Sequence, residues 1–345
     1  MNNTQIDIET LIRKNIRNLK AYTSARNEFT GQAEVFLDAN ENPYGNLNRY
    51  PDPQQFAIKE ILAELKGVDV DQIFVGNGSD EVIDIAFRIF CQPGKDKAIC
   101  FTPSYGMYKV SADINDVELI EVPMGHNFVP DPKKVLEFFN EDVKLMLLCS
   151  PNNPTGNSIP KEIVLELLEF FNGIIIIDEA YIEFSDKESM LSLINDYPNL
   201  IVSQTLSKAW GLANLRIGLA YTSKNMISWF NKVKAPYNVS GASQKEALKV
   251  LKNQVPVNQL ISNIIAERNK LIDTLKGFPF VKEVFPTEAN FVLVEMTDAN
   301  SIYTELCKRG IIVRNRSKLI DNCLRITIGT PEENEKLNNA LNELK

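Results

Sequence analysis

A lysine flanked by hydroxyl-bearing and small side chains follows a short apolar stretch in the second half of the chain. The stretch Leu200-Ile201-Val202 leads into Thr205-Leu206-Ser207-Lys208-Ala209-Trp210-Gly211, and Arg216 stands eight residues beyond the lysine. A lysine at the mouth of a strand, away from bulk water and near other cations, loses its proton readily and can form a Schiff base with an aldehyde. The hydroxyls and the arginine suit a phosphate. An aldehyde and a phosphate in one molecule indicate pyridoxal phosphate (PLP), although Lys208 taken alone is more commonly a solvated loop residue.

Two further polar groups follow apolar strands. Asp178 comes after four isoleucines, and a carboxylate at the end of a buried strand is costly unless it is paired. A cationic pyridinium nitrogen would be a suitable partner, since a protonated ring withdraws electrons. Tyr181 and Asn153 can each reach the phenolic oxygen of the same ring. The alternatives are that Asp178 caps a following helix and that Asn153 belongs to a plain turn.

A glycine-rich turn and a tyrosine extend this pattern. Gly76-Asn77-Gly78-Ser79-Asp80 begins a helical stretch, where free backbone N–H groups make an anion site suited to a phosphate. It lacks the spacing of a dinucleotide fingerprint or a P-loop, and a simple capped turn is the alternative. Tyr105 follows a strand-like stretch and can stack on a flat ring, or merely pack.

Two arginines interrupt apolar segments near the end of the chain. Arg314 follows Ile311-Ile312-Val313, and Arg325 lies between Leu324 and Ile326. Arginine in such places is usually paired with an anion, and it recognises carboxylates and phosphates in bidentate fashion. The alternative is an internal salt bridge to Glu288 or Glu295.

The elements that must position these residues alternate between helix and strand. Uniformly apolar strands separated by helices predict a mainly parallel sheet covered on both faces, with ligands at the carboxyl ends of its strands. We expect Asn153, Asp178 and Lys208 to gather at that edge. The expected helices are 7–20, 53–66, 79–90 and 161–171, and the expected strands are 72–75, 98–101, 145–149, 173–177 and 201–202.

The pattern changes after Pro236. A long helical stretch at 243–275 precedes expected strands at 291–294, 311–313 and 324–328, with a helix at 299–309. This predicts a smaller α+β domain beside the large one. The predicted division is an N-terminal arm and part of the small domain at 1–45, a large PLP-binding domain at 46–235 and a small domain at 236–345.

Composition narrows the class of protein. The 345 residues carry a formal charge of −8 without a Lys/Arg block, which argues against a nucleic-acid or membrane surface. One histidine and five widely spaced cysteines make a zinc site improbable, so no metal is expected. The polar N-terminus lacks the apolar core of a signal peptide, and no apolar run could span a membrane. We expect a cytoplasmic enzyme with small-molecule substrates.

The combined motifs resemble the fold-type I, PLP-dependent aminotransferases, and the resemblance runs over nearly the whole chain. It rests on Ser150–Gly156 (Ser-Pro-Asn-Asn-Pro-Thr-Gly), Asp178–Tyr181 and Ser207-Lys208 with Arg216. Further strings resemble the histidinol-phosphate branch of that family. These are Arg17–Leu19 with Tyr22, Leu37–Pro43, Arg49–Pro53, Gly310–Arg314 and Cys323–Asn334.

The resemblance implies a role for each matching residue toward the cofactor. Lys208 would carry PLP and move the proton between the substrate Cα and the cofactor C4′. Asp178 would pair the pyridinium, Tyr181 and Asn153 would hold the phenolic oxygen, and Tyr105 would stack on the ring. The phosphate would be held by Gly78, Ser79, Thr205, Ser207 and Arg216.

The resemblance also implies a substrate site and a homodimer. Arg325 would bind the α-carboxylate of glutamate or, alternately, the phosphate of histidinol phosphate, while Arg314, Tyr22 and Asn42 would complete that dual site. Tyr50 would reach the cofactor phosphate of the neighbouring subunit. The implied reaction exchanges an amino group between L-histidinol phosphate and 2-oxoglutarate, in histidine biosynthesis.

The sequence leaves other functions open. An aromatic aminotransferase or a threonine-phosphate decarboxylase of the same branch fits the same site, because a fold and a cofactor do not fix the substrate. A PLP-binding regulator would need an effector segment, for which we expect no room. One departure from the family pattern is Asn214, where glycine is common; asparagine tolerates a left-handed backbone, so we expect the loop to be kept.

Overall fold

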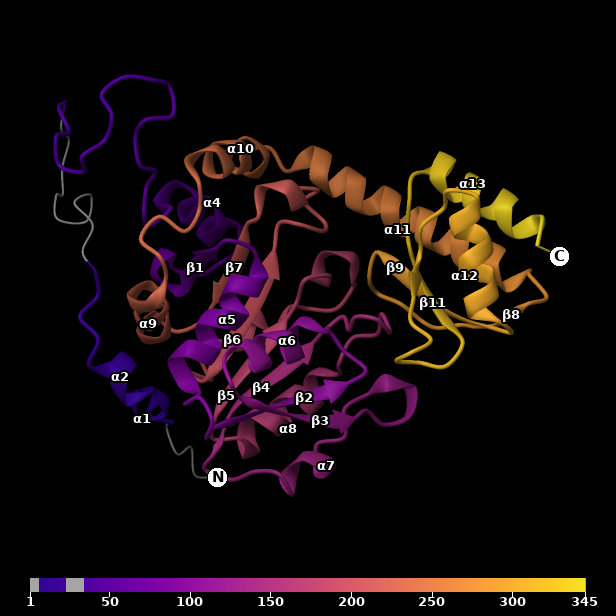
Figure 1. Ribbon diagram of the computed structural model, residues 1–345, viewed down its shortest axis with the longest axis horizontal. Helices are drawn as coiled ribbons and strands as arrows, with labels where there is room; N and C mark the ends of the chain where they lie inside the picture. Colours follow the sequence, from indigo (N-terminus) through magenta and orange to yellow (C-terminus); the bar gives the residue numbers. More distant parts are fainter. Residues whose placement is uncertain (1–5, 23–33, 345) are drawn as a thin grey trace.

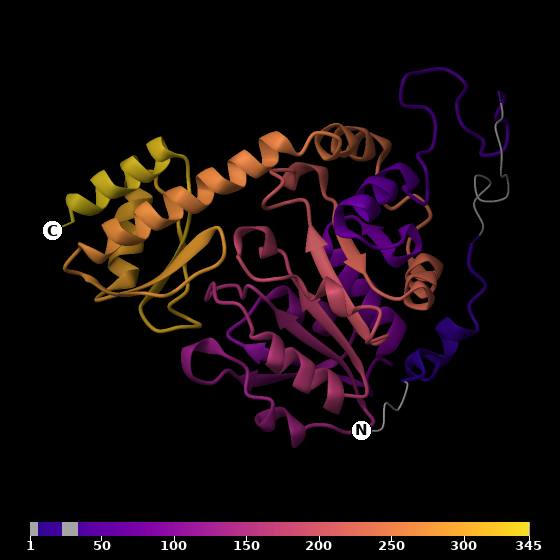
Figure 2. The same ribbon diagram turned by 180° about the vertical axis from the view of Figure 1, so that it is seen from behind.

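The chain folds around two sheets, as the computed structural model shows for residues 6–22 and 34–344 (Figure 1). A seven-stranded sheet forms the larger body, and a four-stranded sheet lies at the other end of the molecule. The long helix α11 (Val255–Lys276) runs from one body to the other, as Figure 2 shows from behind. No helix in these ranges is long and apolar enough to cross a membrane.

The large sheet has the strand order β1-β7-β6-β5-β4-β2-β3. Its members β2 to β6 pair in parallel, while β7 runs antiparallel to both β6 and β1. The mainly parallel sheet is therefore confirmed. The strands are β1 (Ile73–Gly76), β2 (Lys97–Thr102), β3 (Glu118–Pro123), β4 (Val143–Cys149), β5 (Ile174–Asp178), β6 (Leu200–Thr205) and β7 (Gly218–Tyr221).

Both faces of this sheet are buried, which explains its uniformly apolar strands. Along β5, Ile175 and Ile177 join one core cluster while Ile174 and Ile176 join the other, because side chains alternate across a strand. The first face is covered by α4 (Phe56–Lys66), α7 (Lys133–Leu136), α8 (Lys161–Phe170) and α10 (Gly241–Leu251). The second is covered by α1 (Ile8–Leu11), α2 (Lys14–Arg17), α5 (Ser79–Phe90), α6 (Met107–Ile114) and α9 (Lys224–Val233).

The small sheet is antiparallel, in the order β10-β11-β9-β8. Its core includes Leu271, Leu306 and Leu337, one from each of three helices. These are α11, α12 (Ala299–Lys308) and α13 (Pro331–Asn342), and the strands are β8 (Val281–Val284), β9 (Phe291–Met296), β10 (Arg314–Asn315) and β11 (Cys323–Thr327).

Three element predictions need correction. The segment 311–313 forms no strand; pairing with β11 begins at Arg314. The single stretch expected at 243–275 is two helices, because Pro256 lies in the first turn of α11, where a proline starts a helix rather than continuing one. The arm expected at 7–20 is the pair α1 and α2 with a break between them. Strands β3, β7 and β8 were not expected.

The N-terminal helices lie against the large sheet's helices. Ile8, Ile12 and Ile16 belong to the same core cluster as α5 and α9, and the amide of Arg13 donates to the carbonyl of Ile89 at 2.9 Å. These contacts fix where the first described segment sits. The boundaries proposed for the three domains stay a prediction.

Candidate active site

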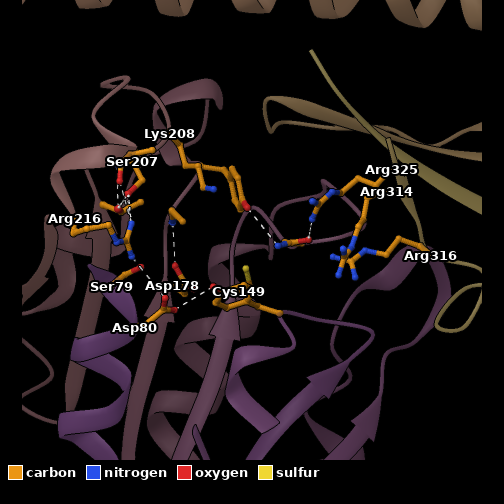
Figure 3. A pocket seen from close by; sticks show the side chains of 16 residues that line it. Ser79, Asp80, Cys149, Asp178, Ser207, Lys208, Arg216, Arg314, Arg316 and Arg325 are labelled. Atoms are coloured by element: carbon orange, nitrogen blue, oxygen red, sulfur yellow. Dashed lines mark hydrogen bonds and ion pairs between the residues drawn. The ribbon is translucent and has the colours of Figure 1, made fainter. Parts of the chain in front are cut away.

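A pocket of about 360 Å³ lies where the parallel strands of the large sheet end, facing the small sheet (Figure 3). The last residues of β4, β5 and β6 all line it, namely Cys149, Asp178 and Thr205. Parallel strands bring their carboxyl ends to one edge, so residues far apart in sequence meet there. The structure thus brings together most of the expected site: Ser79, Tyr105, Asn153, Asp178, Tyr181, Thr205, Ser207, Lys208, Arg216, Arg314 and Arg325.

Asp178 is a buried carboxylate, and no cation from residues 6–22 or 34–344 is in hydrogen-bond contact with it. Only 3% of it is exposed, and it accepts hydrogen bonds from the Tyr108 hydroxyl and the Ala180 amide, each at 3.1 Å. Burial raises its pKa to about 6, although these two hydrogen bonds oppose the rise. A protonated ring nitrogen placed against it would supply the missing positive charge.

Lys208 projects into the same pocket from the loop after β6. Its Nζ lies 5.8 Å from the centroid of the Tyr181 ring. Partial burial lowers the lysine pKa and Arg325 lowers it further, while Asp178 opposes the change. A lysine whose pKa is lowered in this way is a better nucleophile and proton carrier near neutral pH.

Tyr181, Asn153 and Arg325 form a chain of hydrogen bonds across the pocket. The Asn153 amide donates to the Tyr181 hydroxyl at 3.3 Å, and Arg325 donates to the amide oxygen of Asn153. The guanidinium of Arg325 also lies over the Phe291 ring, 5.1 Å from its centroid. This chain links the large-sheet and small-sheet ends of the pocket, and it brings the expected pair Tyr181 and Asn153 into contact.

Hydroxyls and an arginine gather at the opposite end, beside the start of α5. Thr205 donates to the Ser207 hydroxyl at 2.9 Å, and Arg216 approaches the same hydroxyl at 3.5 Å. No side chain of the described residues caps α5, and while the Glu81 amide donates to the Gly78 carbonyl at 3.2 Å, the preceding amides of Ser79 and Asp80 are placed to meet an anion.

Gly78 is required at this helix start for two reasons. Its φ is +85°, and a Cβ atom there would lie 2.5 Å from Nη2 of Arg216. A side chain would therefore displace the guanidinium from its place beside Ser207. Gly78 therefore contributes its backbone to this end of the pocket and leaves room for the Arg216 guanidinium, and it has no side chain that could line the pocket.

Tyr105 and Asp80 interact directly. The Tyr105 hydroxyl donates to Asp80 at 3.1 Å, and Nη2 of Arg216 lies 3.9 Å from the Asp80 carboxylate. Burial and this carboxylate raise the pKa of Tyr105. The hydrogen bond fixes the tyrosine at the mouth of the pocket; its stacking on a cofactor ring stays a prediction.

The small-sheet end carries three guanidinium groups, those of Arg314, Arg316 and Arg325. Arg314 and Arg325 stand directly opposite each other in β10 and β11. Within residues 6–22 and 34–344, none of the three forms an ion pair with a carboxylate. The alternative of an internal salt bridge is therefore wrong: Glu295 pairs with Lys282 and Glu288 accepts from two serines.

Three expected residues lie away from this pocket within the single chain. Tyr50 is 51% exposed and stacks on Tyr237, with ring centroids 4.4 Å apart. Tyr22 is 73% exposed, and Asn42 accepts from the amide of Tyr44. Their roles toward the cofactor and the substrate stay predictions that require a second chain.

Sequence reasoning missed several pocket residues. Asp80 lines the pocket and stands two residues beyond Gly78 of the glycine-rich motif. Tyr108 does not line the pocket but supports it from α6, where its hydroxyl donates to Asp178. Arg316 stands two residues beyond Arg314, and alternate residues of an extended segment share a face. Those spacings were the available signals. Cys149, the last residue of β4, contributes a buried thiol to the pocket lining.

The loop at Asn214 differs in its backbone from the one expected. Asn214 lies within a short 3-10 helix, Ala213–Leu215. The left-handed residues of this loop are Gly211, with a φ of +68°, and Arg216, with a φ of +53°. The expectation that Asn214 must tolerate a left-handed backbone is wrong.

The fold and this pocket define a class of enzyme, and the chain belongs to the family described as aminotransferase class I and II, which it matches over residues 20–341. At a finer level it is similar to a curated histidinol-phosphate aminotransferase from Flavobacterium psychrophilum. The two are 50% identical, and the alignment covers 100% of each chain. The resemblance drawn from the motifs is thereby confirmed.

Solved structures agree on the fold. The histidinol-phosphate aminotransferase from Clostridium acetobutylicum matches with a TM-score of 0.79 at 26% identity, covering 87% of this chain and 91% of that one. The enzyme of the same name from Sinorhizobium meliloti, in complex with pyridoxal-5'-phosphate, matches with a TM-score of 0.77 at 23% identity, covering 86% and 84%. The fold-type I class, with a large mainly parallel sheet and a smaller α+β body, is confirmed.

Proposed function

We propose that this aminotransferase uses PLP to interconvert L-histidinol phosphate and 2-oxoglutarate with imidazole acetol phosphate and L-glutamate, in histidine biosynthesis. One observation carries the proposal: a single pocket is lined by Lys208 and three arginines, and none of these arginines has a carboxylate partner in the described part of the chain. The lysine suits amino-group chemistry on a carbonyl, and the arginines suit an anionic substrate. The full-length similarity to an enzyme of that name supports the same assignment.

The pocket fits PLP at both of its charged ends. The buried carboxylate of Asp178, which contacts no cation among the residues that the structure describes, matches a protonated ring nitrogen. The uncapped start of α5, together with Ser207 and Arg216, matches the phosphate. Bound there, PLP supplies a reactive carbonyl carbon and an electron-withdrawing ring. The residues that would hold it are Gly78, Ser79, Tyr105, Asn153, Asp178, Tyr181, Thr205, Ser207, Lys208 and Arg216.

The side chains around the cofactor would then have separate roles in the reaction. Asp178 keeps the ring nitrogen protonated, because a cation at that position offsets the cost of burying the carboxylate. Tyr181 and Asn153, already hydrogen-bonded to each other, hold the phenolic oxygen. With the cofactor bound, the Nζ of Lys208 would remove the proton from the substrate Cα and return it at the cofactor C4′. Its lowered pKa suits this exchange near neutral pH.

Arg325 and Arg314 serve two substrates at one site. Histidinol phosphate has no α-carboxylate, so its phosphate can take the cationic site that the α-carboxylate of glutamate occupies in the other half-reaction. Arg325 stands at the small-sheet end of the pocket and donates to Asn153, which in turn donates to Tyr181 at the large-sheet end. The decarboxylase and aromatic alternatives are not favoured, because the full-length relative carries the histidinol-phosphate aminotransferase name.

A half-reaction tests this function. PLP-loaded protein is mixed with L-histidinol phosphate alone, and the visible absorbance of the lysine-bound cofactor is followed. We expect that absorbance to disappear and to return on addition of 2-oxoglutarate. Phenylalanine in parallel measures the breadth of specificity. A cofactor that responds to phenylalanine or glutamate but not to histidinol phosphate would leave the family intact and refute the substrate.

We further propose that the enzyme is a homodimer that acts in the cytoplasm. The segment from residue 34 to 50 projects from the large-sheet body in Figure 1 and exposes several apolar side chains, which a second copy would cover. Those side chains are Val35, Leu37, Tyr44 and Leu47. In the dimer, Tyr50 would reach the partner's cofactor phosphate, while Tyr22 and Asn42 would complete the substrate site.

Mixing two inactive variants tests the shared site. Tyr50→Ala and Lys208→Ala chains, combined and allowed to exchange, should regain activity because mixed dimers contain one complete site. A fully active monomer by light scattering would refute the dimer. Cell fractionation tests the location.

A further inference from the structure

The small-sheet end of the pocket holds more positive charge than a single carboxylate needs. Arg314 and Arg325 face each other across β10 and β11, and Arg316 extends into the same space from two residues beyond Arg314 (Figure 3). Like charges directly opposite on a sheet are unfavourable unless an anion lies between them. Two arginines suffice for a bidentate carboxylate, which leaves the third unexplained.

Arg316 is anchored through its backbone and not through its side chain. Its amide donates to the carbonyl of Cys323 at 2.9 Å, and its own carbonyl accepts from the amides of Leu319 and Ile320, at 2.8 and 3.0 Å. In the described part of the chain, its guanidinium donates no hydrogen bond, and its Nε is buried without a partner. The backbone at Arg316 is therefore fixed, while its guanidinium has no partner among the described residues and is available to a ligand.

The electrostatic setting of Arg316 agrees with this picture. Burial, then Arg325 and Arg314, lower the pKa of its guanidinium to about 10. An added anion would relieve both causes, since it neutralises the cluster and offers acceptors to the buried N–H groups. The more negative the anion, the larger this relief.

Phosphate and carboxylate differ in the property that matters here. A phosphate monoester carries about −1.5 to −2 charges at neutral pH and three acceptor oxygens, whereas a carboxylate carries one charge and two oxygens. We propose that Arg316 is a substrate-binding residue that selects the phosphate-bearing amino donor over carboxylate-bearing ones. This inference rests on the proposed function and adds to it the residue that separates the two substrates of the shared site.

The test compares Arg316→Gln with the unaltered holoenzyme in both half-reactions. We expect kcat/KM for L-histidinol phosphate to fall roughly 10- to 100-fold, as for loss of a hydrogen bond to a charged group, and that for glutamate to change much less. Arg316→Lys should recover part of the loss, because it keeps the charge but not the planar fork. Arg309→Gln is the matched control, since Arg309 pairs with Glu343 on the surface of the same body.

The outcomes separate this inference from the proposed function. A fall confined to histidinol phosphate supports it, whereas equal falls for both substrates, or none, overturn it, because a general or structural role would not change their ratio. If the unaltered enzyme accepts glutamate but not histidinol phosphate, the proposed function fails. In that case, inhibition of the glutamate half-reaction by inorganic phosphate tests the role of Arg316 by itself. Weaker inhibition of Arg316→Gln than of the unaltered enzyme supports phosphate recognition by Arg316, and equal inhibition overturns it.

Discussion

At the large-sheet end of the pocket the polar side chains are hydrogen-bonded to one another or to backbone, whereas the small-sheet end gathers three arginines that have no carboxylate partner among the described residues. Asp178 accepts two hydrogen bonds, and Thr205, Ser207 and Arg216 contact one another. At the other end, the described residues include no carboxylate paired with Arg314, Arg316 or Arg325. The large-sheet end is therefore suited to hold a cofactor that stays bound, and the small-sheet end is suited to bind anionic substrates that are exchanged in each turnover.

The two ends also differ in the elements that build them. Parallel strands with buried faces fix the positions of Asp178 and Thr205, because each is the last residue of such a strand. Arg314 lies on a two-residue strand of the small antiparallel sheet, Arg325 lies on the neighbouring strand, and Arg316 directly follows the two-residue strand. Changes at the large-sheet end should slow the chemical step, and changes at the small-sheet end should weaken the recognition of the anionic substrates.

The largest effect is expected from Lys208→Ala at the large-sheet end. Loss of the group that carries the proton should slow the half-reaction roughly 10²- to 10⁴-fold, while the arginine end still binds substrate. Rapid-mixing measurements of the half-reaction give the rate, and substrate binding is measured separately. Lys245→Ala, an exposed lysine on α10, is the control. A half-reaction of normal rate in Lys208→Ala would show that another base moves the proton.

Asp178→Asn should come next. Removing the carboxylate that holds the ring nitrogen protonated should lower the rate of the half-reaction roughly 10²- to 10³-fold, the usual cost of one buried electrostatic contact in a reacting site. Substrate affinity should change little, because the arginine end is untouched. Single-turnover rates against substrate concentration separate the two quantities, and an unaltered rate would remove Asp178 from the site.

The same residue predicts a pH dependence for the protein without cofactor. The pKa of Asp178 rises from an ordinary 3.8 to about 6 on folding, so the native state binds the extra proton between those values. The free energy of unfolding should fall as pH rises through about 6, by up to about 3 kcal/mol from this group. Denaturant titrations at several pH values measure it, with Asp178→Asn lacking that part of the fall. Identical curves for both proteins would contradict the raised pKa.

Arg325→Gln tests the small-sheet end of the pocket. It removes a cation that also contacts Asn153 and Phe291, so kcat/KM should fall roughly 10- to 100-fold for both glutamate and histidinol phosphate. This shared loss distinguishes Arg325 from a residue that acts on one substrate. Steady-state kinetics with both amino donors measure it, and a loss for only one donor would show that the two anions bind at different places.

The contrast between the two ends also explains what the sequence predicted. Asp178, Asn153 and Lys208 each follow an apolar strand, and strand ends converge in a parallel sheet, so their meeting was predictable. Arg316 was harder to predict, because its one signal was its place two residues beyond Arg314, and periodicity is weak around a strand of only two residues. The tyrosine pair Tyr50 and Tyr237 depends on tertiary contact between distant segments, which no local pattern encodes.

The smallest effect is expected at Asn214, where the family pattern and the backbone disagree. Because Asn214 is helical and not left-handed, Asn214→Gly should give no conformational relief and should destabilise the protein by about 0.5–1 kcal/mol, through the greater freedom of glycine in the unfolded chain. Gly211→Ala in the same loop should cost at least as much, although no atom lies within 4 Å of the added carbon, since its φ of +68° disfavours any side chain. Chemical denaturation compares them. A stabilised Asn214→Gly would mean that this residue, and not Arg216, bears the strain of the loop beside the phosphate-binding end.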